Sequence, residues 1–418
     1  MFYSRGDHHT GLGPDFRRIW ISVTISSLGD GMRFVALPLL AARLSSDPRQ
    51  IAAVYLAEQL PLPLFGLLAG AFADRADRRR ILWLADALRA GAVGALAAAV
   101  AAHALTIHLL IGVGFVLGLG QTFYNGAWSG MVPTLVAPKN LTRANARLQA
   151  GALVSDTLLG TPLGALLFGI AAALPFTVDA ASFAAAAALA FLLRGDFGPT
   201  AATAPATWLT LRHDMAHGVR WLWRHHLLRR LCLIAGVTNL VTAALIAVLV
   251  LYARHTLHVG SLGFALLIAS FAVGGMAGAA ATPGLTSRFG SRPVLTVTAA
   301  ATALASAAAG AATSGPAAGA AIAAFGAANL AWSITAVSLR QRLVPAELLG
   351  RVAMAYQMVI GGATAAGAAA GGFVAGAFGL RAPFYAGAVV LVAASFISTR
   401  GEEVGSRASQ RQEQVKGL

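Results

Sequence analysis

The sequence predicts an all-helical (all-α) integral membrane protein with twelve transmembrane helices in two six-helix halves. Of its 418 residues, 57% are hydrophobic and only 11% are charged, which is too apolar for a soluble protein of this size. A membrane-spanning helix needs about 20 apolar residues, and the chain contains twelve such runs. In chain order they lie near residues 19–42, 51–73, 81–102, 105–131, 148–170, 176–193, 231–252, 262–285, 294–313, 317–338, 352–378 and 383–398.

The placement of charge predicts the topology. The net charge is +15, but the basic residues are scattered over short connectors, which argues against a nucleic-acid partner. With both termini in the cytoplasm, most lysines and arginines lie on the inner side of the bilayer, as the positive-inside rule requires. Residues 1–18 lack a cleavable signal pattern, so we expect a multi-pass protein of the plasma membrane. The single cysteine, Cys232, excludes an internal disulfide and provides no metal-binding spacing.

An internal repeat supports the two halves. Two segments match at a shift of 208 positions, and each lies between the fourth and fifth run of its half, as in transporters built from repeats. The matched residues are Leu135, Val136, Leu141, Arg143, Gln149 and Gly164 in the first copy and Leu343, Val344, Leu349, Arg351, Gln357 and Gly372 in the second. We therefore expect an N-terminal half over 19–194 and a C-terminal half over 231–399.

The remaining segments are predicted to be cytoplasmic. They are the N-terminus 1–18, a linker over 195–230 and a disordered tail over 400–418. Apolar residues of the linker recur at helical spacing, which predicts an amphipathic helix on the inner leaflet. His213 and His217 are four residues apart, but a solvated basic face explains them better than a metal site does.

A dense run of charge follows the second apolar run: Gly70, then Asp74, Arg75, Asp77, Arg78, Arg79 and Arg80. The arginines alone would suit a loop that only fixes topology, whereas Asp74 needs another explanation. The pattern resembles the loop signature of the major facilitator superfamily, in which a glycine is followed four positions later by Asp-Arg, and then by a second glycine and two basic residues.

That resemblance implies a conformational switch made of Gly70, Asp74, Arg75, Arg79 and Arg80. In the family the acid faces the N-terminus of a helix in the other half and stabilises one conformation through its charge. We expect this role for Asp74 and, more loosely, for Arg75. Asp77 stands where the family has its second glycine, and aspartate tolerates the left-handed backbone of a tight turn better than most residues do.

Ionisable side chains inside a membrane span are costly and therefore point to function. Asp30 and Arg33 lie three residues apart in the first run, on one helix face and within pairing distance. We favour a proton-carrying role for Asp30 over a purely structural ion pair. Glu58 and Asp156 are the other proton-coupling candidates, either as partners of Arg33 or by titrating alone.

Two further charged sites receive a structural interpretation. Asp86 and Arg89, in the third run, are expected to form a structural network, and Asp179 is expected to make a contact near the outer end of the sixth run. From Leu231 to Thr399 the only acid is Glu347, which lies in a cytoplasmic connector. Any proton coupling through carboxylates must therefore be carried by the first half.

The resemblance also implies that the first, fourth, seventh and tenth spans line a central cavity. Polar and aromatic residues of the last three are the predicted substrate contacts: Phe123, Tyr124, Asn125, Asn239, Asn329 and Trp332. Such a mixture suits a bulky, partly apolar ligand. An aromatic belt at the inner interface explains Trp332 almost as well.

The run Asp74 to Arg80 and the segment Leu135 to Ala146 resemble the macrolide-efflux and enterobactin-exporter branch of the superfamily. Three glycines of the fifth run, Gly151, Gly160 and Gly164, resemble part of its antiporter signature, although close helix packing explains them equally well. The resemblance implies a secondary exporter, acting as a monomer, that moves a drug-like or siderophore-like molecule out of the cell by alternating access. The proton gradient would supply the energy, without a cofactor.

An uptake permease for a small metabolite is the nearest alternative, and a transporter-like membrane sensor is a more distant one. A sensor would need an added cytoplasmic domain, and the connectors are too short for one. An enzyme would need a nucleophile and a base clustered at one membrane face, and the sequence shows no such cluster. It also lacks a phosphate-binding loop, which argues against a pump driven by ATP.

Overall fold

The computed structural model describes residues 14–73, 75–136, 140–193, 220–344 and 349–394 of the 418-residue chain. Asp74, the histidines His213 and His217, and the tail 400–418 lie outside these residues, so the predictions made for them stay predictions. The chain divides into two compact units. The first comprises Met1–Ala41 and Pro61–Ala206, and the second comprises Ala42–Leu60 and Thr207–Leu418.

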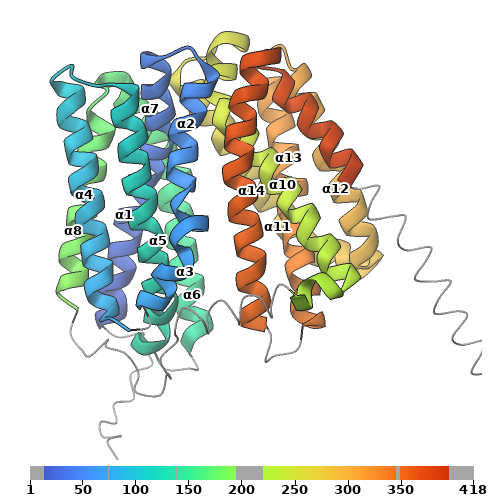
Figure 1. Ribbon diagram of the computed structural model, residues 1–418, viewed down its shortest axis with the longest axis horizontal. Helices are drawn as coiled ribbons and strands as arrows, with labels where there is room; N and C mark the ends of the chain where they lie inside the picture. The colour runs from blue at the N-terminus through green and yellow to red at the C-terminus, as the bar shows by residue number, and fades with distance from the viewer. Residues whose placement is uncertain (1–13, 74, 137–139, 194–219, 345–348, 395–418) are drawn as a thin grey trace, which may run out of the picture. The chain divides into compact units, whose positions relative to one another are not determined.

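The described residues of the first unit form helices joined by short connectors (Figure 1). Its elements are α1 (Pro14–Leu44, which ends in the second unit), α3 (Pro61–Ala73), α4 (Arg78–Ala101), α5 (Ile107–Leu135), α6 (Leu141–Leu153), the π-helix η2 (Val154–Gly160), α7 (Thr161–Ile170) and α8 (Leu174–Phe191). The second unit contains α2 (Pro48–Gln59), α10 (His226–Leu251), the π-helix η3 (Tyr252–Thr256), α11 (Ser261–Phe289), α12 (Ser291–Ala311), α13 (Gly315–Leu343), α14 (Leu349–Phe378) and the apolar helix Ala382–Ala394.

Within the described residues, ten helices are long and apolar enough to cross a membrane. They match the predicted first run and the predicted third to eleventh runs. The described part of the twelfth run is the shorter helix Ala382–Ala394. The predicted all-helical membrane fold is confirmed.

The second predicted run is not one unbroken helix, because it divides at Leu60 into α2 and α3. Pro61 and Pro63 have no amide hydrogen, so two bonds of the helical ladder are missing there. The two pieces also belong to different units, since α2 packs on α14 and α10 while α3 packs on α5. The outer part of this run therefore departs from the predicted N-terminal half.

Side-chain caps explain where several helices begin. Asp47 accepts a hydrogen bond from the backbone N–H of Arg49 at 2.9 Å, and Pro48 occupies the first position of α2. Thr106 caps α5 through the N–H of Leu109 in the same way. Polar caps of this kind end the apolar spans where we expect the lipid headgroups.

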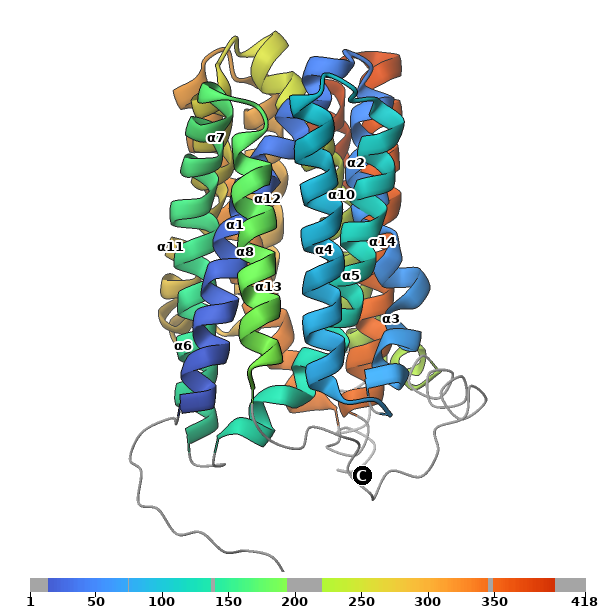
Figure 2. The same ribbon diagram turned by 90° about the vertical axis from the view of Figure 1, so that its left-hand side faces the viewer.

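Glycines let α1 run close to α7, η2 and α8, and Figure 2 shows α1 passing between these elements. A Cβ atom on Gly164 of α7 would lie 2.5 Å from the carbonyl oxygen of Met32. One on Gly160 would lie 2.7 Å from the carbonyl oxygen of Leu28. Because these are backbone contacts, no side-chain adjustment could make room for a larger residue.

The fifth predicted run is helical but contains the π-helix η2 between α6 and α7. The N–H of Thr161 bonds to the carbonyl of Asp156, five residues earlier, and the Thr161 hydroxyl donates to the same oxygen at 3.3 Å. Pro162 follows directly and cannot donate a backbone hydrogen bond. Such wide turns within a helix often mark functional positions, and here the turn carries an ionisable residue.

The second unit relies on the same kind of packing. Gly274 of α11 lies against the backbone of Ala323 on α13, and Gly371 of α14 lies against Ala244 on α10. A different face of α14 receives α2, where Gly372 lies beside Ala52 and the Arg49 guanidinium lies 5.4 Å from the centre of the Phe373 ring. Small residues thus join α14 to two helices from distant parts of the chain.

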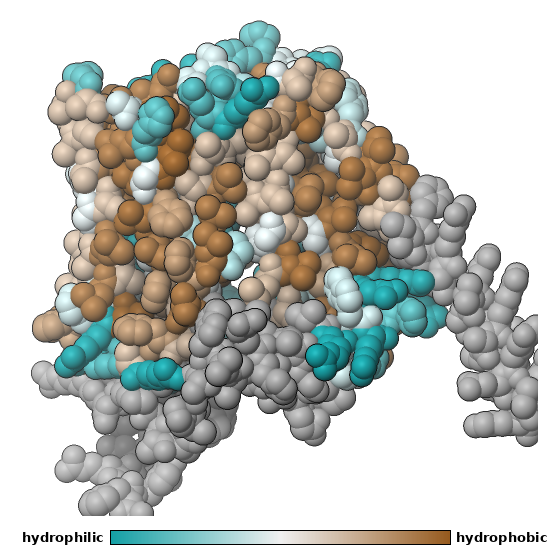
Figure 3. Space-filling view, viewed as in Figure 1, coloured by the Kyte–Doolittle hydropathy of each residue, from teal (hydrophilic) through white to brown (hydrophobic). Residues whose placement is uncertain are grey.

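Large apolar side chains cover much of the outer surface of the helices. Leu84 is 52% exposed, Leu304 71% and Val389 69%. Figure 3 shows hydrophobic residues over the middle of the helices and hydrophilic ones gathered near their ends. This is the distribution that a surrounding bilayer requires.

We predict that Gly164→Ala destabilises the protein while Gly169→Ala, in the same helix, does not. The new Cβ at position 164 would press on the backbone of α1, whereas Gly169 has no heavy atom of another residue within 4 Å of the corresponding position. We expect a loss of about 1–3 kcal/mol for the first substitution. Thermal unfolding of both variants in detergent, followed by circular dichroism, measures the difference, and equal melting temperatures would contradict the packing argument.

Candidate functional site

A charged cluster lies inside the first unit, with Arg33 of α1 between two carboxylates. Its Nη2 atom donates to Asp30 Oδ1 at 2.8 Å, and its Nε atom lies 3.2 Å from Asp179 Oδ2. The side chains of Arg33 and Asp179 are 9% and 0% exposed, and that of Asp30 is 28% exposed. The expected pairing of Asp30 with Arg33 is therefore present, and Asp30 is its more accessible member.

Asp179 is not the helix-end contact that the sequence suggested. It lies in the second turn of α8 and is fully buried. Gly29 of α1 packs directly against the side chains of Asp179 and Ser182. The Ser182 hydroxyl donates to the Asp179 carbonyl oxygen at 2.8 Å. Asp179 lies near the end of the sixth apolar run, which suggested a contact at the helix end rather than an ion pair with Arg33. A carboxylate within an apolar span nevertheless points to function.

Asp156 joins the cluster from η2. Its backbone carbonyl lies against Gly31, and the charges of Asp30 and Arg33 both act on its side chain. Glu58 lies on α2, in the second unit. Among the described residues no group of three or more His, Cys, Asp or Glu side chains is placed to hold a metal ion.

A second buried network surrounds Arg89 of α4, as expected. Its guanidinium donates to the carboxylate of Asp86 and to Gln121 Oε1 of α5. It also lies 4.8 Å from the ring centre of Tyr124 and 4.3 Å from that of Phe183. Asp86 and Arg89 are 0% and 2% exposed, so this network ties α4 to α5 and α8.

Two of the predicted substrate contacts are attached to this network. Tyr124 lies under Arg89 and stacks on Trp128, with ring centres 5.9 Å apart. Asn125 is exposed, and its Oδ1 atom accepts from Gln121 Nε2 at 2.9 Å. The network therefore reaches from a buried ion pair to an exposed amide.

Phe123 faces another direction. It lines a cavity of about 520 Å³ between α3, α4 and α5, together with Phe72, Leu84 and Leu88. The two phenylalanine rings meet edge to face at 6.1 Å. Arg80 of the charged loop lines the same cavity, so Phe123 lies close to this loop.

The charged loop is anchored by Asp77 and Arg79. Asp77 accepts from the N–H of Arg79 at 2.9 Å and caps α4, and its φ of −62° is not in the left-handed region. The anticipated left-handed turn is therefore not used, because the aspartate serves as a helix cap. Arg79 Nη1 donates to the carbonyl of Leu193 at 2.8 Å, while the Arg80 side chain is 73% exposed.

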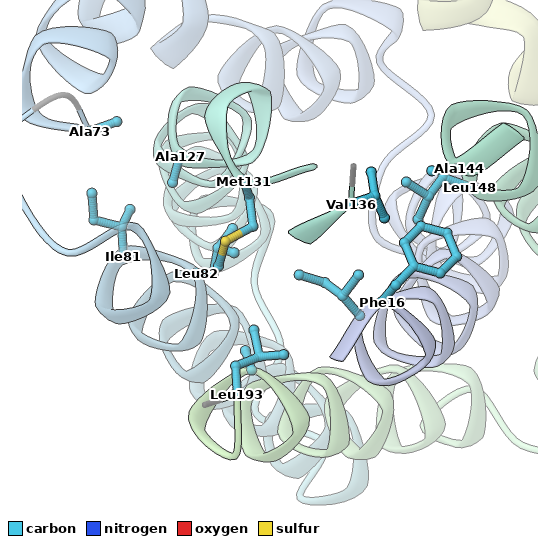
Figure 4. Packing of buried hydrophobic residues seen from close by; sticks show 12 residues of the cluster. Phe16, Ala73, Ile81, Leu82, Ala127, Met131, Val136, Ala144, Leu148 and Leu193 are labelled. Carbon is cyan, nitrogen blue, oxygen red and sulfur yellow. The ribbon is translucent and has the colours of Figure 1, made fainter. Parts of the chain in front are cut away.

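An apolar cluster packs next to this loop. It gathers residues from the beginning of α1 and α4 and from the end of α5, among them Phe16, Leu82 and Met131, together with Leu193 (Figure 4). The carbonyl that receives Arg79 belongs to Leu193 of this cluster. Gly70 has open space around the position of a Cβ atom among the described residues of its own unit.

The remaining predicted substrate contacts lie in the second unit. Asn239 Nδ2 donates to the carbonyl of Ala235 at 2.9 Å, and Asn329 Nδ2 donates to Thr242 Oγ1 at 3.3 Å, which links α13 to α10. Trp332 is only 5% exposed and packs with Cys232 in the apolar core of this unit. Its side chain is occupied by protein contacts in this structure.

Comparison with known proteins places these observations in a family. A family model described as transmembrane secretion effector matches residues 13–414. The uncharacterized MFS-type transporter YfiS of Bacillus subtilis is 26% identical over 413 residues, which is 92% of each chain. The multidrug efflux pump Tap of Mycobacterium tuberculosis is 28% identical over 245 residues, 56% of this chain and 55% of Tap.

A further relative, macrolide efflux protein A of Streptococcus pyogenes, is 25% identical over 156 residues, 37% of this chain and 38% of that protein. Among solved structures, the nucleoside transporter NupG matches with a TM-score of 0.75 at 13% identity, covering 92% of this chain and 98% of NupG. That likeness shows the shared fold. Since the family model spans nearly the whole chain, the protein belongs to the transmembrane secretion effector family of the major facilitator superfamily, a family of multi-pass membrane transporters of small molecules.

Proposed function

We propose that this chain is a secondary exporter that moves a drug-like or siderophore-like molecule out of the cell by alternating access, in exchange for protons. The observation that carries the proposal is the cluster of carboxylates around Arg33 inside the first unit. The names of the relatives Tap and macrolide efflux protein A favour export over uptake. The transporter acts as a monomer with both termini in the cytoplasm, and the proton gradient replaces any cofactor.

The cluster suits proton binding because its charges do not balance. With all groups ionised, Asp30, Asp156 and Asp179 would set three negative charges against the single positive charge of Arg33. Such an excess is costly within a membrane, and a proton on one carboxylate relieves it. Protonation also frees Arg33 to pair more closely with the carboxylates that remain charged.

Asp30 is the member that exchanges the proton. Its side chain is 28% exposed, whereas Asp179 has no exposed surface. Arg33 connects the two, so a proton bound at Asp30 strengthens the interaction of Arg33 with Asp179 on α8 and changes how α1 is held. The same helix contacts η2 through Gly31, so the effect extends to Asp156.

Candidate substrate contacts are found in each unit taken by itself. In the first, the exposed Asn125 and the adjacent stacked rings of Tyr124 and Trp128 offer an amide and a flat apolar surface. Phe123, Asn239, Asn329 and Trp332 are the further candidates. Aromatic rings with a few amides suit a bulky, partly apolar molecule.

Alternating access requires α2 to separate from α14. In this structure α2 packs on α14 through Ala52 and Arg49, which lie against Gly372, although α2 is joined directly to α3 of the first unit. Movement of one unit against the other would strain this connection unless α2 leaves α14. The missing hydrogen bonds at Pro61 and Pro63 provide the flexible joint.

We predict that Asp30→Asn abolishes coupling without abolishing substrate exchange. Asparagine keeps the shape of the side chain but binds no proton, so substrate-induced proton release from inverted vesicles should fall to the level of empty vesicles. Substrate counterflow, which needs no proton, should continue. Asp15→Asn is the matched control, because Asp15 lies on the same helix and pairs with Arg18 near the surface.

The panel for this assay includes macrolides, tetracyclines, cationic dyes and siderophores. Proton release that survives in Asp30→Asn would move the coupling to Asp156, Asp179 or Glu58, which the corresponding asparagine and glutamine variants test. Silence of the wild type over the whole panel, with the protein present, would contradict export. Inward accumulation of metabolites would then be measured.

We also predict that a disulfide between α2 and α14 stops transport. In a Cys232→Ala background, Ala52→Cys with Gly372→Cys places two Cβ atoms 2.5 Å apart, so a small separation completes the bond. The control pair, Gly236→Cys with Ala363→Cys, joins α10 to α14 with Cβ atoms 3.9 Å apart. Oxidation should block dye efflux reversibly in the first pair only, and undiminished efflux after complete oxidation would contradict the predicted movement of α2.

A further inference from the structure

Arg340, one turn before the end of α13, has two guanidinium nitrogens without a hydrogen-bond partner among the described residues. Its Nε and Nη1 atoms are buried and make no hydrogen bond. No described carboxylate lies within ion-pairing distance of it, and the residue as a whole is half-buried rather than exposed. Buried polar groups in proteins are almost always paired, so this arrangement calls for an explanation.

In the described residues of the first unit, Arg33, Arg79 and Arg89 each make at least one hydrogen bond through another nitrogen, although their Nε atoms make none. Arg33 pairs with two carboxylates, and Arg89 donates to Asp86 and to Gln121. Arg79 donates to a backbone carbonyl. Arg340 therefore differs from them in chemistry as well as in position.

In the described part of the second unit, the residues around Arg340 are aromatic or apolar and include no carboxylate. Its guanidinium lies 4.1 Å from the ring centre of Tyr356 on α14, and Cys232 of α10 is near enough for electrostatic interaction. Helices α10 to α14 contain no Asp or Glu in their described residues, and Glu347, in the connector after α13, lies outside these residues. The site is thus positive, aromatic and largely apolar.

An unpaired guanidinium in such surroundings is unfavourable, and the interaction with Tyr356 offsets only part of the cost. A bound carboxylate would offset the rest of this free-energy cost. The planar guanidinium can donate two parallel hydrogen bonds to the two oxygens of a carboxylate. The neighbouring Trp332 and Tyr356 rings belong to the same apolar cluster and are each 5% exposed, so the side of the guanidinium next to them is apolar.

We propose that Arg340, with the Tyr356 ring beside it, binds the carboxylate of the transported molecule, which makes amphiphilic organic carboxylates a substrate class of this transporter. The proposal rests on the proposed function as an exporter, and it assigns to the second unit a role in substrate selection. The first unit binds the proton and the second unit binds the anion, so the proton and the substrate carboxylate bind to different parts of the chain.

The test uses two dyes with the same ring system, the carboxylate fluorescein and the cationic ester rhodamine 6G. Purified full-length protein in nanodiscs of zwitterionic lipid is titrated with each dye, and fluorescence anisotropy gives the affinity. We expect Arg340→Gln to weaken fluorescein binding by about tenfold or more, the worth of a charged hydrogen bond. Arg340→Lys should retain part of it, and rhodamine 6G binding should be unchanged in both variants.

Arg288→Gln is the matched control, since it removes the same charge from α11, where Arg288 lies beside Phe289 at the helix end. Retained rhodamine 6G binding verifies that each variant is folded. A second readout is thermal stability: sodium benzoate should raise the melting temperature of the wild type but not that of Arg340→Gln, at matched ionic strength.

Several results would overturn the proposal. They are fluorescein binding that is unchanged in Arg340→Gln, an equal loss in Arg288→Gln, and binding that rises about tenfold in Glu347→Gln, which would make Glu347 the partner of Arg340. Loss of fluorescein binding when anionic phosphatidylglycerol is added to the nanodiscs would assign the site to a lipid phosphate instead. Proton release driven by rhodamine 6G tests export independently, because it does not use the anion site.

Discussion

Backbone contact along α1 positions the charged groups of the first unit. Gly29 admits Asp179 and Ser182 of α8 to the surface of α1, and Gly31 does the same for the backbone of Asp156. Asp30 stands between these two glycines in the sequence, and Arg33 follows one turn later. The residues that allow helices to approach are thus interleaved with the residues that carry charge, and the ion pairs form because the helices can come this close.

The two units divide the charges unequally. In the first, both buried arginines are paired with carboxylates, so the cost of each guanidinium is offset locally. In the second, Arg340 has an aromatic ring beside it and no carboxylate among the described residues of α10 to α14. The two predicted halves share a sequence repeat, yet the partners of their arginines differ in this way.

Much of the fold could be read from hydropathy, because the bilayer forces long apolar runs to be helical. The pairing of Asp30 with Arg33 followed from spacing within one helix. Asp179 was misjudged because its role depends on which face of α8 meets α1, and a single sequence holds no direct record of contacts between helices. The attachment of α2 to the second unit was missed for the same reason.

Other differences between the sequence-based predictions and the structure arise where a local interaction outweighs the pattern used for the prediction. The prolines after Leu60 divide a run whose hydropathy alone suggests one span. Asp77 was expected to adopt a glycine-like turn, yet its carboxylate forms a helix cap instead. Trp332 was expected to line a cavity because it is an aromatic residue of the tenth span. Packing in an apolar core stabilises an aromatic side chain equally well, and that is where Trp332 lies.

The π-helix η2 changes the helical phase of the fifth span. Nine residues along an unbroken α-helix amount to about two and a half turns, which would put Gly151 and Gly160 on opposite sides. Both nevertheless lie against α1, Gly151 beside Trp20 and Gly160 beside Leu28. Because the wide turns of η2 rotate the chain less per residue, they bring the two glycines onto one continuous surface, so a spacing that looks irregular in the sequence becomes a single contact line along α1.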